Sequence, residues 1–123
     1  MGAHGSAYGR FRRALASGNA TIAWAAAAEL ERVGLADALA VLLLQVDTEP
    51  ERFDRAVVRL HARLCAEARG LTLREAQLAL AALAALRGRG GSAAAHALSE
   101  LLVIRGLNEC ADVLERWASE RGQ

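Results

Sequence analysis

The order of apolar and polar positions predicts helices along almost the whole chain. Apolar residues recur at every third or fourth position, and the strict alternation of a half-buried strand is absent from the sequence. The residue types agree, because the abundant Ala, Leu, Arg and Glu lose little entropy in a helix. We therefore predict an all-α fold, a compact bundle of about six to seven short helices.

Two segments of the chain are apolar on nearly every side. Between residues 35 and 46 only Asp37 and Gln45 are polar, and the segment from Thr72 to about Leu86 is again almost entirely Ala and Leu. A helix that is apolar all round is normally buried. We expect both segments to be central helices, and we expect the amphipathic helices at about 20–33 and 50–69 to alternate with them.

Three Gly-Leu pairs predict where helices end. They begin at Gly34, Gly70 and Gly106, which lie 36 residues apart, and Gly tolerates the left-handed conformation that closes a helix. This period matches the length of one helical hairpin in solenoid families, so stacked antiparallel hairpins and an irregular bundle both stay open. Helix starts are predicted at Thr48 and Thr72, because a Glu follows each Thr at the third position.

The length of the chain favours one domain. A chain of 123 residues can bury a single core without disulfides or a metal. We predict a disordered arm or tag remnant over residues 1–9, a single helical domain over 10–118 that begins near Arg10, and a frayed tail over 119–123. The glycine-rich residues 87–91 form the one internal linker in this prediction.

Charge and cysteine content narrow the class of partner. The 15 basic residues, all Arg, and 14 acidic residues give a net charge of +1, so no global field attracts nucleic acid or a membrane. The most apolar stretch, 35–46, is much shorter than the roughly 20 residues needed to cross a bilayer. Cys65 and Cys110 are far apart, which is typical of reduced, buried thiols in a cytoplasmic protein. We expect a cytoplasmic location without membrane attachment.

One local cluster of charge remains. Four arginines recur at steps of three or four residues and share one side of the helix after Thr48, roughly opposite its apolar face: Arg52, Arg55, Arg59 and Arg63. Such a stripe can bind carboxylates or phosphates, or it can be a solvated face with pairs such as Glu51 to Arg55 and Arg63 to Glu67. A second basic cluster, Arg10, Arg12 and Arg13, lies near the N-terminus, and neither cluster has interleaved aromatic residues that could stack bases.

Other side chains give weaker indications of chemistry. His61 and Cys65 are one turn apart, but two ligands do not make a metal site, and no third group orients a Cys-His nucleophile pair. Trp24 and Trp117 could anchor an interface, although core packing is the simpler expectation. We predict no catalytic residues, no cofactor and no metal.

Most of the sequence resembles a known group of proteins. Phe11-Arg12-Arg13-Ala14-Leu15, Glu49-Pro50-Glu51-Arg52-Phe53 and Gly106-Leu107 are similar to segments of short all-helical proteins from actinomycete-type (high-GC) genomes, a group without an assigned activity. The resemblance implies a self-contained cytoplasmic helical domain. Similarity to tetratricopeptide repeats is confined to the period.

These observations favour a non-enzymatic helical module, adaptor or regulatory, that binds another protein or a second copy of itself through the faces of its more amphipathic helices. The arginine stripe is available for a partner with an acidic surface. The alternative is a nucleic-acid-binding regulator that uses the stripe together with Arg10–Arg13. A metalloprotein or enzyme centred on His61 and Cys65 is the third hypothesis.

Overall fold

The computed structural model describes residues 3–121, with side chains from residue 7 onward. Within this range the chain forms seven helices and no strand, which confirms the predicted all-α class. The helices are α1 (Ala3–Ser17), α2 (Ala20–Ala27), α3 (Leu35–Thr48), α4 (Pro50–Glu67), α5 (Leu73–Ala85), α6 (Gly91–Ile104) and α7 (Asn108–Arg121).

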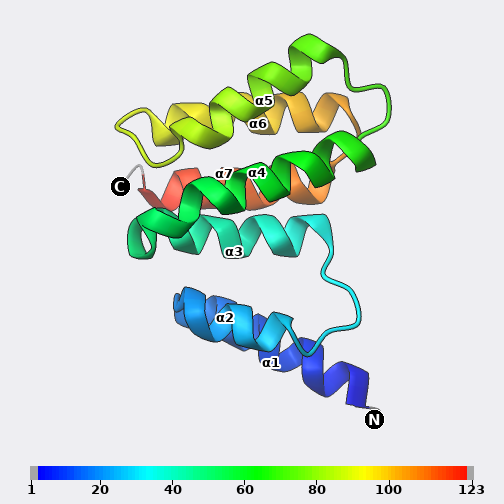
Figure 1. The fold of residues 1–123 in the computed structure, drawn as a ribbon, viewed down its shortest axis with the longest axis vertical. Coiled ribbons are helices and arrows are strands. Elements are labelled where there is room, and N and C mark those ends of the chain that lie inside the picture. Colours follow the sequence, from blue (N-terminus) through cyan, green and yellow to red (C-terminus); the bar gives the residue numbers. More distant parts are fainter. Residues whose placement is uncertain (1–2, 122–123) are drawn as a thin grey trace.

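The helices are stacked along the long axis of the molecule. Figure 1 shows α5 and α6 at one end, then α4 and α7, then α3, and finally α2 and α1 at the other end. Helix α3 packs against α4 and α7 on one side and against α2 and α1 on the other. The sequence predicted this central position, and seven of its residues are buried, including Gln45.

Two separate clusters of side chains form the core. The larger cluster contains side chains from each of the five helices α3, α4, α5, α6 and α7, and Phe53, Leu83 and Leu114 are among its fully buried members. The smaller one joins α1 and α2 to α3 through Phe11, Ala14, Ala23, Ala27 and Val41. Helix α3 contributes to both clusters, so the packing of α1 and α2 on the remaining helices depends on it.

The predicted central role of the segment after Thr72 is wrong. In α5 only Ala79 and Leu83 are buried, whereas Leu73 and Leu78 are 76% and 65% exposed. Helix α5 lies at the end of the stack and packs against α4 and α6 only, so its outer face has no neighbouring helix within residues 3–121. An Ala- and Leu-rich sequence is compatible with both a central and a terminal helix.

Several predicted boundaries also need correction. The first helix begins at Ala3, not near Arg10, so the expected disordered arm is helical from residue 3, and residues 1–2 lie outside the described range. At the other end α7 continues to Arg121, so residues 119–121 of the expected tail are helical, and 122–123 are not described. Helix α2 ends at Ala27, well before Gly34.

Gly34 does not close a helix. It precedes α3 with a φ of −64°, whereas Gly18, Gly70 and Gly106 have φ values of 77°, 74° and 79°. Only the second and third Gly-Leu pairs therefore follow the predicted left-handed geometry. The 36-residue spacing therefore does not mark the end of α2, which lies at Ala27 and not at the first Gly-Leu pair.

The two predicted capping boxes behave differently. The Thr72 hydroxyl accepts from the Glu75 amide at 3.1 Å, and the Glu75 carboxylate accepts from the Thr72 amide at 2.9 Å, as predicted. Thr48 instead belongs to the last turn of α3 and donates to the Leu44 carbonyl at 2.8 Å. A helical threonine commonly bonds the carbonyl four residues earlier, and here Glu49 alone links α3 to α4.

Thr72→Ala is expected to lower the free energy of unfolding by about 1 kcal/mol, since it leaves a helix-end amide without its acceptor. The same substitution at Thr48 removes no cap and should change stability by less than about 0.5 kcal/mol. Urea denaturation followed by circular dichroism measures both. Equal losses would contradict the assignment of Thr72 as the cap.

Candidate functional site: a groove between α2, α3 and α4

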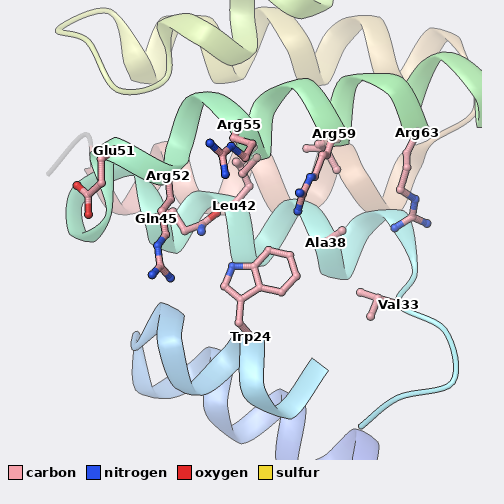
Figure 2. Close-up of a pocket in the computed structure, with 12 residues that line it drawn as sticks. Trp24, Val33, Ala38, Leu42, Gln45, Glu51, Arg52, Arg55, Arg59 and Arg63 are labelled. Atoms are coloured by element: carbon pink, nitrogen blue, oxygen red, sulfur yellow. The ribbon is translucent and has the colours of Figure 1, made fainter. Parts of the chain in front are cut away.

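A cavity of about 760 Å³ lies between α2, α3 and α4. Its floor is one face of α3, made by Ala38, Leu42 and Gln45. One wall is α4, and the other consists of Trp24 on α2 and Val33 in the segment that follows. Figure 2 shows Trp24 rising from α2 towards the α3 floor, opposite the α4 side chains. We refer to this cavity as the groove.

All four arginines of the predicted stripe line the groove. Their spacing places them on one side of α4, while Phe53, Val57, Leu60 and Leu64 form its buried side. Figure 2 shows Arg52, Arg59 and Arg63 extending from α4 across the opening. The stripe therefore faces a cavity with an apolar floor, an arrangement that differs from an open solvated face.

The charges at the two ends of the stripe are compensated. Arg52 pairs with Glu49 at 3.3 Å and Arg63 pairs with Glu67 at 3.0 Å. The second of these pairs agrees with the solvated-face interpretation, but the expected pair between Glu51 and Arg55 does not form. Each formed pair neutralises one arginine, and Glu51, which also lines the groove next to Arg52, adds a negative charge at that end.

The middle of the stripe carries uncompensated charge. No carboxylate of the described chain lies within 4.0 Å of Arg55 or Arg59. Both residues are exposed to solvent on the side of α4 that lines the groove. Two positive charges are thus concentrated above the apolar floor.

A buried polar group lies at the floor of the groove. Gln45 is 2% exposed, and its amide oxygen accepts no hydrogen bond from any part of the chain that the structure describes. Leaving a buried acceptor unpaired costs roughly 1–3 kcal/mol. The oxygen is shielded from solvent, so a ligand in the groove would not reach it without movement of the floor. Sequence reasoning did not identify Gln45 as a site residue, although a polar residue that interrupts an otherwise apolar segment is a signal that could have found it.

Trp24 is at the surface of the groove, and the expected core packing of this residue is wrong. Its side chain is 42% exposed, while Ala23 and Ala27 on the same short helix are buried. The Asn19 side chain starts α2 by accepting from the Ile22 amide at 3.0 Å. The alanines bury their side of α2 against α1 and α3, which leaves Trp24 on the side that faces α4.

The basic cluster at the N-terminus lies on α1, apart from the groove. Arg10 pairs with Glu29 at 3.0 Å, and Arg12 lies 3.4 Å from Asp37 on α3. The Tyr8 hydroxyl also donates to Asp37, at 3.2 Å. These contacts join α1 to the rest of the molecule and partly neutralise the cluster.

His61 and Cys65 are close together, at 3.6 Å from imidazole Nε2 to the thiol sulfur. However, Nε2 also lies 2.7 Å from the Ala76 carbonyl oxygen and donates to it, so His61 links α4 to α5. Cys65 is exposed, contrary to expectation, whereas Cys110 is buried and its burial raises its pKa to about 11. No cluster of three or more metal-ligating side chains occurs among residues 7–121.

None of the helices described between residues 3 and 121 has the length and apolar character required to span a bilayer. Comparisons of the chain with protein-family models, with curated proteins and with solved structures give no match.

Proposed function

We propose that the chain is a non-enzymatic interaction module whose groove binds an acidic segment of another protein. The observation that carries this proposal is the pair of uncompensated charges, Arg55 and Arg59, above an apolar floor. A carboxylate of a bound segment would meet two guanidinium groups that have no acidic partner within the described chain, and charge-assisted hydrogen bonds of this kind are stronger than neutral ones. The free thiols agree with a reducing compartment, and we propose the cytoplasm.

The apolar part of the groove supports the same proposal. Trp24 is a large, partly exposed aromatic side chain, and such residues often contribute much of the binding energy at protein interfaces. Leu42 and Ala38 provide apolar surface below it. A protein segment that combines acidic and apolar side chains would complement both parts.

Substituting both Arg55 and Arg59 with alanine is expected to weaken binding of the protein's partner about tenfold or more, which corresponds to at least about 1.4 kcal/mol. The partner is first isolated by affinity purification with the wild-type protein, and its affinity is then measured by titration calorimetry. Thermal stability should hardly change, because neither arginine has an ion-pair partner within the described chain.

The matched control removes two arginines elsewhere. Arg74 and Arg116 are exposed on α5 and α7 and, like the groove pair, form no ion pair within the described residues. The Arg74→Ala, Arg116→Ala variant has the same net charge as the groove variant and should bind like wild type. Equal loss in both variants would show a nonspecific effect of charge and would contradict the proposal.

The nucleic-acid hypothesis is tested with the same proteins. It requires the Arg10–Arg13 cluster to be available, and Arg10 and Arg12 are paired with acidic side chains. Binding of duplex DNA that depends on Arg55 and Arg59 and weakens steeply between about 50 and 200 mM salt would favour that hypothesis over ours.

A further inference from the structure

We infer that the segment bound in the groove is an amphipathic α-helix with acidic residues along one flank. This inference rests on the proposed function and specifies its partner. It follows from the backbone chemistry of the groove, the register of the arginines and the short side chains of Ala38 and Ala56.

The walls of the groove favour a helix over an extended segment. Helices α3 and α4 bond their backbone groups internally, so the groove offers no strand edge to an extended peptide. An extended peptide on the apolar floor would bury amides and carbonyls without partners, at a cost of a few kcal/mol each. A helix satisfies these groups itself and presents only side chains to the floor.

The spacing of the arginines matches that of acidic residues on a neighbouring helix. From Arg52 to Arg63 the helix rises about 16 Å, and Arg55 and Arg59 are about 6 Å apart along the axis. A partner helix that lies along α4 has the same rise per residue, so Glu or Asp at positions i and i+4 would face these two arginines. The flanking Arg52 and Arg63 are already paired and would contribute less.

The floor requires small or apolar residues on the adjacent side of the partner helix. Ala38 on α3 and Ala56 on α4 have short side chains, which lets a partner helix approach closely. Trp24 would then cover the partner's apolar side from α2.

The test uses defined peptides in place of an unidentified partner. The patterned probe is a fluorescein-labelled peptide of about 18 residues with Leu and Ala on one face and Glu at i,i+4 positions on its flank. The shuffled probe has the same composition without amphipathic order, and the basic probe has Lys in place of Glu. Binding is followed by fluorescence anisotropy.

The wild-type protein should bind the patterned probe at least tenfold more tightly than the shuffled or basic probe. The Arg55→Glu, Arg59→Glu variant should lose this binding and gain affinity for the basic probe, while Arg74→Glu, Arg116→Glu should behave like wild type. This exchange of specificity requires direct contact between the probe's flank and the α4 arginines.

A second readout reports whether the probe covers the groove. In a Trp117→Phe variant Trp24 is the only tryptophan, and Trp117 lies outside the groove beside Arg121. The emission of Trp24 should shift to shorter wavelength when the patterned probe binds, because the indole becomes less exposed. An unchanged spectrum on saturation would overturn the inference.

The outcomes separate this inference from the proposed function. Equal binding of the patterned and shuffled probes overturns the helical partner, and the proposed function still holds if the isolated partner needs Arg55 and Arg59. If neither the partner nor any probe depends on these arginines, both the inference and the proposed function are wrong.

Discussion

Replacing Phe11 with alanine is expected to detach α1 and α2 from the rest of the protein. Phe11 is fully buried and is the largest side chain in the smaller core cluster, whose other buried members are Val41 and three alanines. Removing a buried phenylalanine side chain costs roughly 3–5 kcal/mol. Within residues 3–121, α1 and α2 pack only on each other and on α3, so little else holds them in place.

The consequence is measurable by hydrogen exchange. Amides in α2 should lose protection in the Phe11→Ala variant, while those in α6 and α7 keep it. Binding of the patterned probe should also fall, since the wall that carries Trp24 would no longer be fixed. The surface contacts of Asp37 with Tyr8 and Arg12 are too exposed to compensate.

Phe53→Ala is the matched control. Phe53 is also fully buried, but it belongs to the larger cluster that joins α3 to α7. This substitution should lower the main unfolding transition and reduce protection throughout the chain. If Phe11→Ala instead gives the same uniform loss, the molecule is one cooperative unit, as the predicted single domain over 10–118 implies.

Gly91→Ala is expected to destabilise the connection between α5 and α6. A Cβ atom at Gly91 would lie 2.3 Å from the carbonyl oxygen of Leu86 and 3.5 Å from the Trp117 ring. The first contact is with backbone, so the turn itself must move, at a cost of about 1–3 kcal/mol. The melting temperature should fall by several degrees, which thermal circular dichroism would detect.

Gly90 provides the control for this substitution. A Cβ atom there meets no atom within 4 Å, and its φ of −87° suits any residue. Gly90→Ala should therefore be neutral or stabilise the protein by up to about 1 kcal/mol. Similar melting temperatures for the two variants would contradict the proposed steric origin.

Local patterns in the sequence predicted local features well. The apolar segment 35–46 correctly indicated a central helix, and Thr72 with Glu75 correctly indicated a cap. Gly34 and Thr48 were misread because each motif has two compatible geometries. The sequence does not show which one the surrounding structure selects.

The end of α2 at Ala27 was not predictable from propensity. Residues 28–33 are good helix formers, yet Leu30 and Val33 leave the helix and pack against the smaller core cluster. Tertiary burial outweighs helix propensity here, since propensities differ by less than about 1 kcal/mol per residue. A helix that continued to residue 33 would not produce the same wall of the groove.

The candidate site was predicted in part. The arginine stripe follows from helical periodicity on α4 alone, so the sequence was sufficient to find it. Its neighbours Trp24 and Gln45 come from α2 and α3, and only the packing of these helices brings them to the stripe. The structure also shows that Arg52 and Arg63 form ion pairs with nearby acidic side chains, whereas the two central arginines, Arg55 and Arg59, form none within the described residues.

The unequal connections around the groove imply that its two sides adapt differently. Glu49 alone joins α3 to α4, which holds the floor and the arginine wall in a fixed relation. The opposite wall is joined to α3 through the non-helical residues 28–34 and rests on the smaller core cluster, in which Phe11 is the only large side chain that is fully buried. Displacement of α1 and α2 can therefore adjust the width of the groove to partner helices with side chains of different size. The arginines on α4 stay in place and select acidic partners in each case.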